Sequence, residues 1–147
     1  MQGGKTRAEQ GGTYLLVLRM EREEVIKVGR LGTFLFPPGY YVYMGSALAG
    51  LGPRLHRHLS RRKKLHWHID YLLERAQLKE VRAEVSPERL ECQWAEAIGK
   101  LAEAEFPAPG FGASDCSCGA HLVYFRGQPR LQKFGSKWLD VFPSGGE

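Results

Sequence analysis

The sequence contains no asparagine, only three cysteines and no long uninterrupted hydrophobic run. An odd number of cysteines argues against a secreted disulfide framework and leaves metal ligation or buried thiols as their roles. The first eleven residues lack the apolar core of a signal peptide, and no segment approaches the ~18 apolar residues that span a bilayer. These absences predict a soluble, cytoplasmic protein with no membrane partner. The lack of thermolabile asparagine is consistent with a thermophilic source.

The length and composition fit one globular domain. The chain has 147 residues, of which 43% are hydrophobic and 25% are charged. This is enough apolar material for one core, and the chain is too short to favour a second. We expect a single domain over residues 12–142, between a flexible N-terminal segment (1–11) and a flexible C-terminal tail (143–147).

Positive charge is concentrated in one segment. The net charge is +5, and residues 54–64 (RLHRHLSRRKK) carry six fixed positive charges, two histidines and no acid. Helical periodicity would gather these cations on one face, which suits phosphate groups, although a solvated helix surface is the alternative. The residues expected to bind a nucleic-acid backbone are Arg57, Arg61, Arg62, Lys63 and Lys64.

The hydrophobic pattern predicts an α+β fold, with a small antiparallel sheet that is extended by an inserted hairpin and flanked by helices. Pro53 suits the first turn of a helix, and Ser86 with Pro87 is typical of a helix start. The expected strands are residues 13–20, 24–28, 33–36, 40–44, 78–85, 121–125 and 130–134, and the expected helices are 53–62, 65–76 and 87–105.

Four motifs in a fixed order resemble the GIY-YIG endonucleases. They are Gly-Thr-Tyr at 12–14, Tyr-Met-Gly at 43–45, Arg54 on the basic helix, and Glu91 three residues before Trp94 on a later helix. Each motif alone is weak, but their order and their placement on strands and helices match that family. The segments PPGYYVYMGSA, KLHWHIDYLL and PGFGASDCSCGAHLVYF extend the resemblance to the Uri-type (DUF123-like) branch, over nearly the whole chain.

Two departures from the general pattern stand out. The 28 residues between Tyr14 and Tyr43 exceed the short hairpin of the wider family, and an extra strand pair near residues 24–36 would absorb them. The family's additional asparagine has no counterpart in this chain.

The resemblance implies a metal-dependent endonuclease that hydrolyses phosphodiester bonds in DNA, and RNA is not excluded as a substrate. By analogy with Uri-type domains that are fused to repair enzymes, it also suggests a role in DNA repair and a repair enzyme as partner. The alternatives are an inactive nucleic-acid-binding module of the same fold and a zinc-stabilised interaction domain. The oligomeric state is left open.

The expected catalytic residues have roles that suit their chemistry. Glu91 would bind Mg²⁺ or Mn²⁺, and the forked guanidinium of Arg54 would stabilise the phosphate. The resemblance implies that Tyr14 acts as the general base and that Tyr43 supports it. Nearby cations such as Arg54 and the metal would lower the tyrosine pKa from about 10. His58 would relay a proton or bind phosphate, or else face solvent within the basic patch.

A second set of residues has metal-ligating side chains. Structural zinc would take as its four ligands Cys92, Cys116, Cys118 and His121, and buried thiols or one disulfide are the alternatives. His66, His68 and Asp70 form an H-x-H-x-D pattern, for which we favour hydrogen bonds that stabilise the fold over a metal site.

Overall fold

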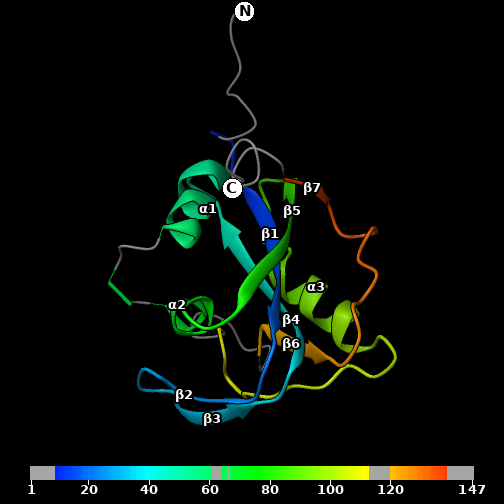
Figure 1. Cartoon of the computed structure of the whole chain (residues 1–147). Coiled ribbons are helices and arrows are strands. Elements are labelled where there is room, and N and C mark those ends of the chain that lie inside the picture. Colours follow the sequence, from blue (N-terminus) through cyan, green and yellow to red (C-terminus); the bar gives the residue numbers. More distant parts are fainter. Residues whose placement is uncertain (1–8, 61–63, 66, 113–119, 139–147) are drawn as a thin grey trace, which may run out of the picture.

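The computed structural model describes residues 9–60, 64–65, 67–112 and 120–138, which form the predicted α+β fold. A five-stranded antiparallel sheet has the strand order β6-β4-β1-β5-β7, and β2 and β3 form a separate two-stranded sheet (Figure 1). The strands are β1 (Gly12–Met20), β2 (Glu24–Val28), β3 (Gly32–Phe36), β4 (Gly39–Ala47), β5 (Gln77–Val85), β6 (Leu122–Phe125) and β7 (Ser136–Lys137). The helices are α1 (Leu51–Leu59), α2 (His68–Leu73) and α3 (Glu91–Gly99).

The large sheet separates two hydrophobic clusters, because alternate residues of a strand face opposite sides. Tyr14, Leu16 and Tyr43 pack in the cluster that includes Leu51 and Leu55 of α1. The intervening residues of the same strands pack with Trp94 and Ile98 of α3. Figure 1 shows this arrangement, with α1 and α2 on one side of the sheet and α3 on the other.

The predicted helix 87–105 is shorter than expected at both ends. It begins at Glu91, because Ser86 closes a turn with the N–H of Glu88, and the N–H of Leu90 donates to the Thr13 hydroxyl at 2.9 Å. It ends at Gly99 instead of near Pro107. Glu105 pairs through its backbone with Tyr124 beside β6, and this extended pairing is incompatible with a continued helix.

The other differences also have tertiary causes. Residues 130–134 are not a strand, because three carbonyl groups in the segment 132–135 accept hydrogen bonds from the Arg82 guanidinium, and β7 pairs with β5 instead. Helix α2 occupies only the middle of the predicted helix 65–76. Helix α1 begins two residues before the predicted start at Pro53 and ends at Leu59.

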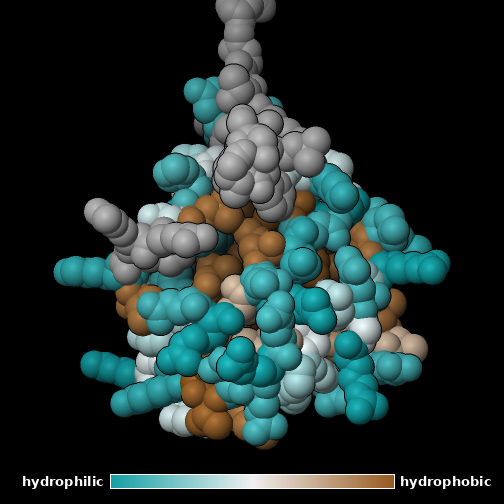
Figure 2. Space-filling view, viewed as in Figure 1, coloured by the Kyte–Doolittle hydropathy of each residue, from teal (hydrophilic) through white to brown (hydrophobic). Residues whose placement is uncertain are grey.

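The predicted flexible segments lie mostly outside the described residues. Residues 9–11 of the N-terminal segment are described. There the carbonyl group of Gln10 accepts the backbone N–H of Leu51, and that of Gly11 accepts the N–H of Ser86. In the described part of the chain the longest helices, α1 and α3, have nine residues each, well below the roughly 20 of a membrane-spanning helix. Hydrophilic side chains predominate on the face shown in Figure 2.

Gly45 on β4 provides a test of the packing between the two central strands. It lies directly opposite Tyr14, and a Cβ atom at Gly45 would come within 2.5 Å of the Tyr14 hydroxyl and 2.6 Å of Cζ. We therefore expect Gly45→Ala to displace the ring and to lower the free energy of unfolding by about 1 to 3 kcal/mol. Gly127→Ala is the control, since a Cβ there meets nothing within 4 Å. Equal denaturation midpoints for both variants would contradict this packing.

Candidate functional site

Two tyrosines and a histidine form the centre of the candidate site. The rings of Tyr14 on β1 and Tyr43 on β4 lie 6.3 Å apart, and the His58 ring of α1 lies 5.3 Å from the first and 6.3 Å from the second. The Tyr14 hydroxyl is 2.6 Å from His58 Nε2, which is a short hydrogen bond. Register explains the grouping, since Tyr14 opposes Gly45 and Leu16 opposes Tyr43 on one face of the sheet.

His58 is not on the exposed basic face of α1. Only 2% of this residue is exposed, and it packs against Tyr14 and Tyr43 within the protein. The solvent-facing alternative for His58 is therefore wrong. Helical periodicity grouped His58 with the arginines, but it carries no information about the two tyrosines, which pack against His58 in the last turn of α1.

Arg54 and Glu91 meet through Ser46 near the end of β4. Nη1 of Arg54 donates to the Ser46 carbonyl at 2.7 Å, and the Ser46 hydroxyl donates to Oε1 of Glu91. Arg54 also lies close enough to Tyr14 for its positive charge to lower the pKa of the phenol. Glu91 is the first residue of α3, and its side chain is 15% exposed. The structure thus brings together five predicted catalytic residues: Tyr14, Tyr43, Arg54, His58 and Glu91.

Thr13 holds the start of α3 beside this cluster. It pairs across the sheet with Ser46, and its buried hydroxyl accepts the N–H of Leu90, the residue before Glu91. The Thr13 hydroxyl therefore holds the backbone of Leu90, just before Glu91, and the Ser46 hydroxyl holds the Glu91 side chain. The sequence interpretation gave neither residue a role. The sequence signal that could have identified them is a serine or threonine within or beside each tripeptide, on strands that are largely apolar.

The Tyr14 phenol is harder to ionise than the sequence suggested. Burial raises its pKa to about 12, and the nearby Arg54, which lowers the pKa, only partly offsets this effect. Burial likewise raises the pKa of Tyr43 well above its ordinary value. Arg54 therefore lowers the Tyr14 pKa, as expected, but its effect is too small to bring the pKa below the ordinary value. Desolvation is the larger influence.

His121 connects Glu91 to Cys92. His121 Nδ1 lies 3.8 Å from Oε2 of Glu91, and its Nε2 lies 3.6 Å from the Cys92 sulfur. Burial lowers the pKa of His121, although the negative charge of Glu91 opposes this shift. The other two residues of the zinc hypothesis, Cys116 and Cys118, lie outside the described residues. Among those that are described, no three His, Cys, Asp or Glu side chains form a metal-binding group.

The H-x-H-x-D segment makes hydrogen bonds that stabilise the fold. His68 Nδ1 accepts the N–H of Gly112 at 2.8 Å. The fully buried Asp70 accepts the N–H of Trp67 at 2.8 Å and pairs with Arg57. His66 lies outside the described residues. These contacts match the structural alternative for His68 and Asp70.

Few residues of the predicted nucleic-acid-binding set fall in the described part of the chain. Arg57 makes hydrogen bonds with both oxygens of Asp70 and with the carbonyl group of Lys64, and Lys64 itself is exposed. The positions outside the described residues are Arg61, Arg62 and Lys63.

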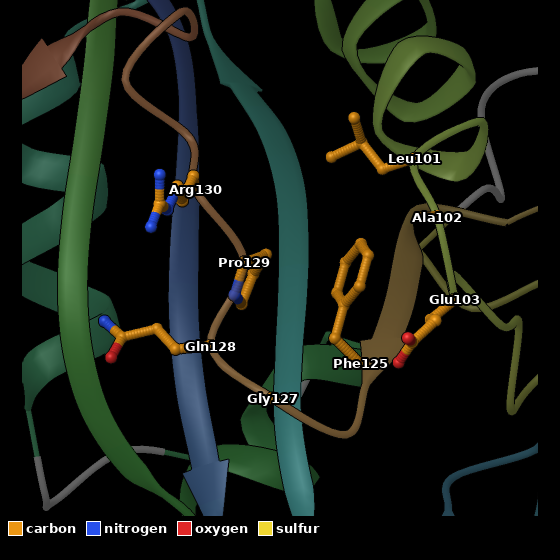
Figure 3. Close-up of a pocket in the computed structure, with 8 residues that line it drawn as sticks. All are labelled: Leu101, Ala102, Glu103, Phe125, Gly127, Gln128, Pro129 and Arg130. Carbon is orange, nitrogen blue, oxygen red and sulfur yellow. The ribbon is translucent and has the colours of Figure 1, made fainter.

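A surface pocket of about 310 Å³ lies elsewhere, between the end of α3 and the loop after β6 (Figure 3). It contains none of the predicted site residues, and Phe125 and Leu101 give it partly apolar walls. Its lining residues are Leu101, Ala102, Glu103, Phe125, Gly127, Gln128, Pro129 and Arg130. The catalytic-type side chains therefore define the candidate site, and this pocket does not.

Comparison with known families places the chain in one of them. Residues 13–142 match the family model described as "Domain of unknown function DUF123". Because the match covers most of the chain, this protein belongs to the DUF123 family. The DUF123 part of the sequence resemblance is thus confirmed. No curated protein and no solved structure gives a match.

The raised pKa of Tyr14 predicts a specific alkaline behaviour. Between the ordinary value of 10.0 and about 12, the unfolded chain releases this proton while the folded protein keeps it. The free energy of unfolding should therefore fall as pH rises through this window. Tyr14→Phe should make the fall shallower, as measured by urea unfolding across the alkaline range. Tyr40→Phe, at a partly exposed position, controls for the loss of a phenol. If Tyr14→Phe leaves the slope unchanged, Tyr14 ionises at its ordinary pH.

Proposed function

We propose that this protein is a metal-dependent endonuclease that hydrolyses phosphodiester bonds in DNA. The observation that carries the proposal is the meeting of a hydrogen-bonded Tyr14–His58 pair with Arg54 and Glu91, residues from three different elements. Phosphodiester hydrolysis requires a proton acceptor for water, a cation beside the phosphate and charge stabilisation of the leaving oxygen. The GIY-YIG resemblance of the four sequence motifs supports the same activity.

The Tyr14–His58 pair supplies a route for the proton of the attacking water. At neutral pH the Tyr14 phenol keeps its proton, because its pKa is about 12. It donates this proton to His58 Nε2 when the histidine carries its own proton on Nδ1. As Tyr14 removes a proton from water, its own proton passes to His58, so no free phenolate accumulates. His58 is thus the final proton acceptor in the proposal.

Arg54 is the group that binds the scissile phosphate. One guanidinium nitrogen is anchored on the Ser46 carbonyl, and the guanidinium lies near the Tyr14 phenol, whose pKa it lowers. A planar fork with five donors retains capacity for phosphate oxygens after this bond. The guanidinium also keeps a positive charge near the Tyr14 phenol, which receives the proton of the attacking water in this proposal.

The donor chemistry of Glu91 fits a hard divalent cation. Its carboxylate is partly exposed and oriented by Ser46, and Mg²⁺ or Mn²⁺ often binds through one protein carboxylate together with water and phosphate oxygens. A cation held by Glu91 would neutralise charge on the phosphate and the leaving oxygen. A cluster of three ligands is not required for this mode of binding.

The proposed substrate is DNA, held by phosphate contacts from the basic segment after α1. Net positive charge and the acid-free segment 54–64 support a polyanion, and a repair partner is suggested only by the Uri-type resemblance. An inactive binding module of the same fold would bind DNA without cleaving it. A zinc-stabilised interaction domain would neither bind nor cleave DNA.

Cleavage should depend on Glu91 and on the guanidinium shape of Arg54. Glu91→Gln keeps an oxygen for the Ser46 hydroxyl but loses the charge, so Mg²⁺-dependent cleavage of a labelled duplex should fall by about two orders of magnitude. Arg54→Lys should fall comparably, because an ammonium lacks the fork. DNA affinity should change little in both variants.

The matched control for Glu91→Gln is Glu96→Gln on the same helix. Glu96 is 71% exposed and pairs with Lys100, away from the tyrosine cluster. Full cleavage by Glu91→Gln, or an equal loss in Glu96→Gln, would remove Glu91 from the mechanism.

Binding should be strongly salt-dependent if the basic segment contacts phosphates. A plot of log affinity against log salt concentration has a negative slope. We expect its magnitude to decrease by about 0.9 for each phosphate that the protein no longer neutralises. Alanine at Arg61, Arg62, Lys63 and Lys64 should therefore flatten the slope in fluorescence anisotropy titrations. Alanine at Lys79, Arg126, Arg130 and Lys133 removes the same charge elsewhere and is the control. Identical slopes for both sets would exclude the segment as the binding surface.

A further inference from the structure

The indole ring of Trp67 contacts three side chains of α1, including two from the candidate site. The guanidinium carbon of Arg54 lies 4.4 Å from the ring centroid, and that of Arg57 lies 4.2 Å from it. The His58 ring packs edge-on against the indole, with 5.4 Å between centroids. A single aromatic side chain, just before α2, therefore touches both the proposed phosphate-binding group and the proposed proton acceptor.

Asp70 fixes the position of Trp67. This fully buried carboxylate accepts the backbone N–H of Trp67 at 2.8 Å, and it also receives hydrogen bonds from Nη1 and Nη2 of Arg57 at 3.0 and 3.1 Å. A buried carboxylate is strongly destabilising unless it is paired, so this contact is held firmly. Asp70 thus ties the indole to α1 through both the Trp67 backbone and Arg57.

The same ion pair distinguishes the two arginines. Two guanidinium groups on one ring repel each other, but the charge of Arg57 is balanced by Asp70. Arg57 therefore helps to hold the ring, whereas Arg54 projects its charge toward Ser46 and Tyr14. On this basis Arg57 contributes less to phosphate binding than its place in the basic sequence suggested.

We infer that Trp67 is a positioning residue that holds the Arg54 guanidinium and the His58 ring in their working orientations. The inference rests on the proposed nuclease activity and adds to it a residue that touches no substrate. The physical basis is the attraction between a guanidinium and the face of an indole, together with edge-on packing of the imidazole. Loss of the aromatic face frees Arg54 to leave the phosphate site without removing its charge from the protein.

The experiment compares Trp67→Phe with Trp67→Leu. Both shorten the side chain and leave it apolar, but only phenylalanine keeps an aromatic face for a cation. With duplex DNA and Mg²⁺, we expect kcat to be about tenfold lower for the leucine variant than for the phenylalanine variant, with KM and melting temperature similar in the two. Equal kcat values, or kcat losses that follow melting temperature, would overturn the inference.

Tyr40 supplies the matched control. Its ring lies 5.9 Å from the guanidinium carbon of Arg19, at the opposite end of the β1–β4 pair from Tyr14. Tyr40→Phe and Tyr40→Leu should have the same kcat. A difference between them would show that any arginine–aromatic contact in this fold affects turnover, which would contradict a specific role for Trp67.

An NMR measurement separates this inference from the proposed activity. The Nε–Hε resonance of Arg54, assigned from its absence in Arg54→Lys, should be shifted by the indole ring in the wild type and should move to the position of solvated arginines in Trp67→Leu. An unmoved resonance would overturn the positioning role even if the protein cleaves DNA. A moved resonance in a protein that never cleaves would instead reject the nuclease and leave the positioning of Arg54 established.

Discussion

The candidate site depends on the close packing of the Tyr14 side chain of β1 against Gly45, its partner residue on β4. The Tyr14 ring occupies the space that a side chain at position 45 would fill, and the antiparallel register sets Tyr43 on the same face. Tyr14 then reaches His58 and Arg54 on α1. The two tripeptides are thus one packing unit, in which a tyrosine from one strand requires a glycine in the other.

Burial controls the chemistry of this cluster more strongly than charge does. Arg54 lowers the pKa of Tyr14, but desolvation outweighs it and leaves the phenol protonated at neutral pH. A buried tyrosine can still transfer a proton if an acceptor lies within hydrogen-bond distance, and His58 meets that condition. The site therefore suits a paired proton transfer better than a preformed phenolate.

The sequence predicted local elements well, and it predicted long-range contacts only where the family motifs indicated them. The β2 strand has the predicted bounds Glu24–Val28, because a short β-branched run between turns is a local signal. The order of the motifs also predicted the grouping of Tyr14 with Arg54. The start of α3 was missed, because it depends on a hydrogen bond from Leu90 to Thr13, 77 positions away. The burial of His58 likewise depends on residues that come together only in the folded chain.

Ser46 serves the candidate site through two chemically different groups. Its backbone carbonyl anchors Arg54, and its side-chain hydroxyl orients Glu91. Every amino acid carries the carbonyl group, but few carry the hydroxyl. Substitution at this one position can therefore alter how the carboxylate is held while the arginine keeps its anchor, so the two halves of the site can be tuned separately, by evolution or by design.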